Sequence, residues 1–160
     1  MKRKDDRLYE DNPGFKCKTQ VAVKSLEDIE VQFYFVNESI GILCLWDKKL
    51  PFAYLWDECL IIEDLDEDKN LDYNGNSLDR DVKFNPTEVI VMRPNNELVL
   101  KCNVTKYFTF EIGKNYRLKY NTWMPLIDAE KKHTMKYYKK DNRELPIFFL
   151  LETEWVNFKT

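Results

Sequence analysis

Apolar and polar residues alternate with a period of two through most of this chain, between short turn-forming segments. In the segment 29–36 (IEVQFYFV), Val31, Phe33 and Phe35 fall on one face of an extended backbone. Similar alternation recurs in 116–123 (YRLKYNTW). Nine or ten such strand signals, with hardly any helical period, are typical of an antiparallel β-sandwich or barrel. We therefore predict an all-β fold, or a mainly β fold with one short helix.

Turn residues indicate where the helix lies and which strands form hairpins. The helix is expected over residues 127–134, with Asp128 as its N-cap. Two units of sequence LWDxxL, ten residues apart, suggest a hairpin of matching aromatic strands. The other expected hairpins are 88–93 with 97–104, 106–112 with 116–123, and 133–140 with 145–158. The fragment FEIGKNYRL resembles the opening of SH3-like barrels, where an aromatic strand turns through Gly-Lys into a Tyr-bearing strand. This resemblance implies an SH3-like C-terminal part.

The domain organisation is simple. Residues 1–14 are highly charged and contain the turn signal Asn12-Pro13-Gly14, so we expect a flexible N-terminus. Residues 15–160 are expected to form a single β-rich domain, with a subdivision near 82–90 as the alternative. Residues 63–87 are polar and rich in turn residues, which predicts one long loop.

Composition and cysteine spacing narrow the class of protein. Apolar residues make up 44% and charged residues 33% of the chain, which favours a folded domain over a disordered one. No apolar run approaches the roughly 18 residues that span a bilayer. The charged opening residues are not followed by an apolar stretch, so we do not interpret them as a secretory signal. The four cysteines form no CxxC pair. We expect reduced thiols in a cytoplasmic protein that has no contact with membranes.

Catalytic chemistry has little support in this sequence. The chain has one histidine, His133, which lies among lysines, and no Gly-x-Ser-x-Gly elbow or glycine-rich phosphate loop occurs. We therefore expect a protein that is not an enzyme and that needs no cofactor.

The segment 56–90 carries 11 acidic and 3 basic residues and is the strongest candidate for a binding site. We expect its carboxylates to meet a basic surface on another protein, as in inhibitors and immunity proteins. The aromatic LWD hairpin would supply apolar anchors, because Trp residues dominate binding hot spots. The predicted partner-binding residues are Trp46, Asp47, Trp56, Asp57, Asp64, Asp66 and Asp68.

Part of the acidic segment also fits a calcium loop, with oxygen ligands on alternate residues and a glycine at the sharp turn. The ligands of this alternative calcium site would be Asn70, Asp72, Asn74 and Asp81.

Residues 91–160 carry 13 basic and 8 acidic residues, and lysines there border tyrosines. Such a surface suits single-stranded nucleic acid, with phosphates on lysines and bases stacked on rings. The residues of this alternative are Lys119, Lys136, Tyr137, Tyr138, Lys139 and Lys140. A second alternative is a structural or assembly protein of a virus or phage.

Overall fold

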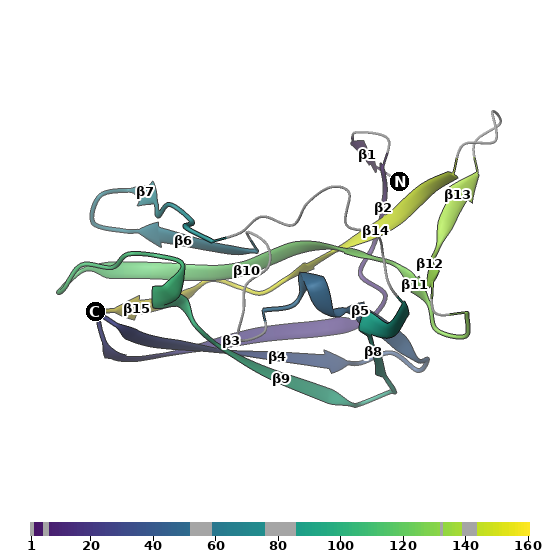
Figure 1. The fold of residues 1–160 in the computed structure, drawn as a ribbon, viewed down its shortest axis with the longest axis horizontal. Helices are drawn as coiled ribbons and strands as arrows, with labels where there is room; N and C mark the ends of the chain where they lie inside the picture. Colours follow the sequence, from purple (N-terminus) through teal and green to yellow (C-terminus); the bar gives the residue numbers. More distant parts are fainter. Residues whose placement is uncertain (1, 5–6, 52–58, 76–85, 132, 139–143) are drawn as a thin grey trace.

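The computed structural model describes residues 2–4, 7–51, 59–75, 86–131, 133–138 and 144–160. Its strands form open, mainly antiparallel sheets that lie face to face, so the predicted all-β sandwich is confirmed, and the described strands do not close into a barrel (Figure 1). Within these residues the helices are three-residue 3₁₀ turns, and none could cross a membrane. They are η1 (Asp47–Lys49), η2 (Pro86–Glu88) and η3 (Val104–Lys106).

The first layer is a three-stranded antiparallel sheet in the order β3-β4-β9. Its central strand pairs Phe33 with Thr19 of β3 and with Leu100 of β9. Alternate residues of β4 point inward, so Val31, Phe33 and Phe35 are fully buried, as the sequence pattern predicted. The strands are β3 (Phe15–Ser25), β4 (Asp28–Asn37) and β9 (Glu97–Asn103).

The second layer is built around the eleven-residue strand β10. One edge of β10 pairs with β6, and the other edge pairs with β15 and then β14. Strand β2 adds to β14 in parallel, although we expected the N-terminal segment that contains it to be flexible. The strands are β1 (Lys2–Lys4), β2 (Arg7–Glu10), β6 (Leu60–Asp64), β7 (Lys69–Asn70), β10 (Asn115–Pro125), β13 (Lys136–Tyr138), β14 (Glu144–Glu152) and β15 (Val156–Lys159). The pairing of β13 with β14 agrees with the expected C-terminal hairpin.

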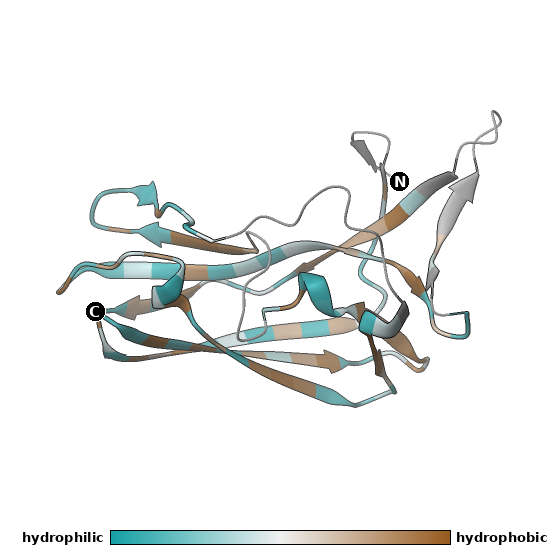
Figure 2. Cartoon of the chain, in the orientation of Figure 1, coloured by the Kyte–Doolittle hydropathy of each residue, from teal (hydrophilic) through white to brown (hydrophobic). Residues whose placement is uncertain are grey.

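Aromatic rings join the two layers. Phe33 and Phe35 both meet the ring of Tyr120 edge to face, at centroid distances of 5.7 and 5.6 Å. Phe15 stacks on Phe149 at 5.8 Å. Figure 2 shows hydrophobic and hydrophilic residues alternating along the strands, as expected when one face of each sheet is buried.

A short strand pair closes one end of the sandwich and corrects two predicted hairpins. It consists of β5 (Leu43–Trp46) and β8 (Val89–Met92). The turn at Pro94-Asn95-Asn96 forms, but β8 and β9 do not pair across it, because β8 joins β5 and β9 joins β4. The LWD hairpin is also wrong in its described part, since β5 pairs with β8 whereas β6 pairs with β10.

Two further local predictions were wrong. The described residues of 127–134 form no helix, because β11 (Ile127–Asp128) and β12 (His133–Thr134) pair antiparallel with each other. The carboxylate of Asp128 accepts the N–H groups of Glu130 and Lys131, as an N-cap would, but the chain then reverses. Residues 107–112 form no strand, so the strand pair implied by the SH3-like resemblance does not exist.

Buried Asn37 links the first layer to the short strand pair. Its side-chain amide donates to the carbonyls of Gly41 and Met92, both at 2.8 Å, and its oxygen accepts the N–H of Ser39. Strands from the first half of the chain also pair with strands from the second half: β6 pairs with β10, β4 with β9, and β5 with β8.

Candidate functional site: an acidic groove beside Lys114

The acidic segment begins as a β-hairpin, so the prediction of one long loop over 63–87 was wrong at its start. Strand β6 ends at Asp64, and β7 returns with Lys69 opposite Asp64. The carboxylate of Asp64 accepts the N–H groups of Asp66 and Glu67 at 2.9 and 3.1 Å, which fixes the turn between the strands. The hairpin extends beside the start of β10 and is hydrophilic at its tip (Figures 1 and 2).

Three carboxylates surround the ammonium group of Lys114. The Lys114 Nζ atom lies 3.0 Å from Asp64 Oδ2, 3.0 Å from Glu67 Oε1 and 2.8 Å from Glu111 Oε2. We call these four residues the Lys114 cluster. Asp64 is only 2% exposed, so this carboxylate supports the hairpin from inside and presents little surface to a partner.

The ionisation of the cluster follows from these contacts. Burial acts to raise the pKa of the Asp64 carboxyl, but hydrogen bonds from Lys114 and from the turn N–H groups outweigh it and lower the pKa below its usual value. Hydrogen bonds from Lys69 and Lys114 lower the pKa of Glu67. Hydrogen bonds to Glu111, Asp64 and Glu67 raise the pKa of Lys114 well above its ordinary value. Asp64, Glu67 and Lys114 are therefore charged at neutral pH.

A groove of about 330 Å³ opens beside the Lys114 cluster. We call it the acidic groove, and it is lined by Asp64, Glu67, Lys69, Asn70, Leu71, Asp72, Asn74, Thr109, Glu111 and Tyr116. Four of these side chains are carboxylates, against which Lys69 and the adjoining Lys114 supply two positive charges. The groove thus keeps two uncompensated negative charges, together with neutral oxygen acceptors.

The other predicted acidic residues lie at the tip of the hairpin. Asp66 accepts the backbone N–H of Asn115 at 2.9 Å, which ties the tip to β10. Asp68 adopts a positive φ of 52° at the turn and is exposed. Asp66 thus has an internal structural partner, and Asp68 faces solvent.

Trp46, the aromatic anchor residue that the structure describes, lies far from the acidic groove. Trp46 is 6% exposed, its backbone N–H meets Met124 Sδ, and its ring N–H donates to Glu88. Asp64 pairs with Tyr116 at the other end of β10. Met124 lies eight positions after Tyr116 along β10, which is about 26 Å at a rise of about 3.3 Å per residue. The structure therefore does not bring Trp46 together with the carboxylates of the groove.

Asp47 follows Trp46, and the pKa of its carboxyl is shifted in the opposite direction to the pKa values of Asp64 and Glu67. Burial, and then the negative charge of Glu88, raise the pKa of the Asp47 carboxyl, while Lys48 opposes this effect. Trp56 and Asp57, the second half of the predicted anchor, lie outside the described residues.

Three of the four predicted calcium ligands, Asn70, Asp72 and Asn74, line the acidic groove, and Asp81 lies outside the described residues. Asn70 belongs to β7, where it pairs with Glu63. Within the described ranges, no three His, Cys, Asp or Glu side chains are grouped as a metal site would require.

Of the residues predicted to bind nucleic acid, Lys119 has a described side chain, and both Lys119 and the nearby Arg117 are paired with carboxylates. Lys119 Nζ lies 2.9 Å from Glu152, and Arg117 Nε lies 2.6 Å from Glu63. Both cations also lie over the ring of Trp155, at 5.7 and 4.2 Å. Lys136, Tyr137 and Tyr138 form β13, whereas Lys139 and Lys140 lie outside the described residues.

Sequence reasoning missed Glu111 and the role of Lys114. These residues come about 50 positions after Asp64, and nothing in the local pattern indicates that the two segments meet. The available signals were the acidic end of one strand, at Asp64, and the later Gly113-Lys114 turn. They indicate a contact only when the pairing of β6 with β10 is known.

Comparison of the sequence with protein-family models and with curated proteins gave no match, so the candidate site rests on its geometry.

Proposed function

We propose that this protein is a non-enzymatic binding module whose acidic groove receives a basic side chain of a partner protein. An inhibitor or immunity-type protein, which occupies a site on another protein, would act in this way. The partner would present lysine or arginine to the groove, and electrostatic attraction would speed its approach.

The Lys114 cluster is the observation that carries this proposal. The molecule already holds one ammonium group against carboxylates of the groove, at distances of 2.8–3.0 Å. Each carboxylate has about four lone-pair positions, so Glu67 and Glu111 retain acceptor capacity after binding Lys114. Asp72 adds a carboxylate for which no ion pair is seen among the described residues.

A paired capture experiment tests the proposal. The tagged wild-type protein and the variant Asp72→Asn/Glu111→Gln are incubated with extract of the native source, with and without nuclease. Asp64 and Glu67 still hold Lys114 in this variant, so the hairpin should remain folded. The control Glu38→Gln/Glu154→Gln removes two exposed carboxylates that do not line the groove.

We expect one protein to be recovered in stoichiometric amount by the wild type and the control, but not by the groove variant. Capture that is indifferent to the groove substitutions would contradict the proposal. Partners that vanish with nuclease would instead favour the nucleic-acid alternative.

A further inference from the structure

Strand β9 lies at an edge of the first layer. Strand β4 pairs with one side of it from Glu97 to Asn103. Within the part of the chain that the structure describes, no strand pairs with its other side (Figure 1). Such an edge presents a row of backbone N–H and C=O groups that can extend the sheet.

The side chains of this edge are complementary to themselves. Glu97, Val99 and Lys101 point to the outer face, while Leu98 and Leu100 point to the core side. When two copies of β9 pair antiparallel with Val99 opposite Val99, Glu97 of each copy lies opposite Lys101 of the other. Leu98 likewise lies opposite Leu100. Opposite charges at directly facing positions stabilise a strand pair, and apolar residues fill the remaining positions.

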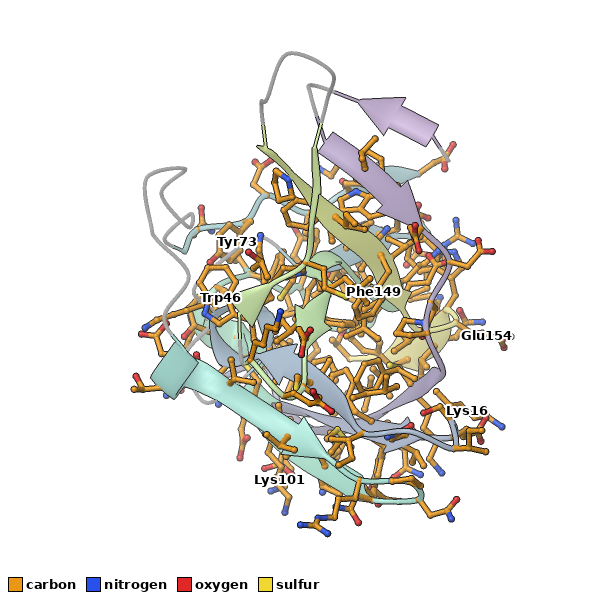
Figure 3. All side chains as sticks on the ribbon, turned by 90° about the vertical axis from the view of Figure 1, so that its right-hand side faces the viewer. Lys16, Trp46, Tyr73, Lys101, Phe149 and Glu154 are labelled. Carbon is orange, nitrogen blue, oxygen red and sulfur yellow. The ribbon has the colours of Figure 1, made fainter. Side chains whose placement is uncertain are left out.

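These residues are available for such pairing. Val99 is 44% exposed, so its side chain is accessible to a second copy. Glu97 and Lys101 are also exposed, and neither forms a salt bridge with another described residue. Lys101 lies at the outer surface of the molecule, below the sandwich (Figure 3).

The opposite edge of the same sheet does not offer this complementarity. The outward residues of β3 include Lys16, Lys18 and Lys24 and no acidic residue. Pairing of β3 with a second β3 would bring like charges together, and lysines on edge strands are a common protection against such contacts. The two edges therefore differ in a way that favours a closed pair over an open chain of molecules.

We propose that two copies of this chain associate through β9, in the antiparallel register centred on Val99. The pair forms a continuous six-stranded sheet. One Glu97–Lys101 pair lies on each side of a central Val99 contact, which makes two such pairs in total. The contact is a single strand edge, so the dimer is weak and exchanges with monomer.

Charge reversal at the two ends of the contact tests the proposal. Sedimentation velocity is measured over protein concentrations up to about 1 mM for the wild type, Glu97→Lys, Lys101→Glu and the double variant. In each single variant, like charges face each other at both ends of the contact, so the dimerisation affinity should fall by about tenfold or more. The double variant restores both pairs with their signs exchanged and should regain the dimer. Because both residues are exposed, thermal melts should show that every variant is folded.

Lys18→Glu on β3 serves as the control and should leave the association unchanged. Hydrogen exchange of residues 97–103 should slow as the protein concentration rises. The proposal fails if the wild type is monomeric throughout, if the single variants associate like the wild type, or if the double variant does not recover. Growth beyond a dimer that changes with Lys18→Glu would assign the contact to β3 instead.

Discussion

The side-chain hydroxyl of Thr153 accepts the backbone N–H of Tyr120 at 3.0 Å, and the Thr153 N–H donates to the Tyr120 carbonyl at 3.0 Å. Thr153 lies between β14 and β15, where one extra residue interrupts the pairing with β10. A side-chain oxygen thus replaces a backbone acceptor at the interruption. Because of this replacement, both C-terminal strands can pair with the same edge of β10.

Removing that oxygen should destabilise the sandwich. Thr153→Val keeps the volume but leaves the buried Tyr120 N–H without its acceptor, which should lower the free energy of unfolding by about 1–3 kcal/mol. Thr153→Ser keeps the hydroxyl and should lower it by less than about 1 kcal/mol. Urea denaturation followed by Trp fluorescence measures both changes. Equal losses in the two variants would show that the hydroxyl contributes nothing.

Gly14 occupies a backbone conformation that other residues avoid. Its φ is +137°, and an added Cβ atom would lie 2.8 Å from Ser39 Cβ. Gly14→Ala should therefore lower the free energy of unfolding by about 1–3 kcal/mol. Gly41→Ala is the matched control, because nothing lies within 4 Å of an added Cβ there. That variant should be neutral or more stable by up to about 1 kcal/mol in the same denaturation assay.

Acid should weaken the protein through the Lys114 cluster. Burial opposes the effect, but the lowered pKa values of Asp64 and Glu67 favour their charged forms in the folded state. This contribution is complete above the unfolded-state pKa values of about 4 and is lost as pH falls through the folded-state values.

Lys114→Met removes the strongest influence that lowers the pKa of Asp64 and the second of the hydrogen bonds that lower the pKa of Glu67, and it leaves the burial of Asp64 unchanged. Its urea midpoint should fall less between about pH 5 and pH 2 than that of the wild type, or should rise. Lys16→Met, which removes an exposed lysine 3.8 Å from Glu38, should keep the wild-type pH profile. Parallel profiles for the wild type and Lys114→Met would contradict this account of the cluster.

The thiols of the folded protein should be unreactive. Burial raises the pKa of the Cys17 and Cys102 thiols to about 12. Cys44 and Cys59 are each 3% exposed. At pH 8 the thiolate fraction of Cys17 is small, so alkylation by iodoacetamide should be roughly a thousandfold slower than for a free thiol. Mass spectrometry before and after addition of urea measures this, and rapid labelling of Cys17 in the folded state would contradict it.

The faces of individual strands were predictable from the sequence, but their partners were not. Alternation placed Val31, Phe33 and Phe35 on the buried side, because burial of one face imposes a period of two. The turn at Pro94-Asn95-Asn96 was also predictable, since turn chemistry is local. Yet β8 and β9 diverge after it, since β8 pairs with β5 and β9 with β4, and such long-range pairings are not encoded in the residues of the turn.

In the candidate site, too, local features were predictable from the sequence but long-range contacts were not. A cluster of acidic residues was visible in the sequence, but its neutralisation by Lys114 depends on the long-range pairing of β6 with β10. Asp128 shows why the local signal was ambiguous. An N-cap and a tight turn both use an aspartate oxygen to bind the next N–H groups, and only the following residues decide between them.

The central position of β10 has a consequence for how the chain is made. Tyr120 supplies the ring that meets Phe33 and Phe35, and it is synthesised more than 80 residues after them. At about 5–20 residues per second, β4 therefore spends roughly 4–17 s outside the ribosome without that cover. During this interval the nascent chain carries a bare apolar sheet face, which makes speed of translation and access to chaperones a determinant of its yield.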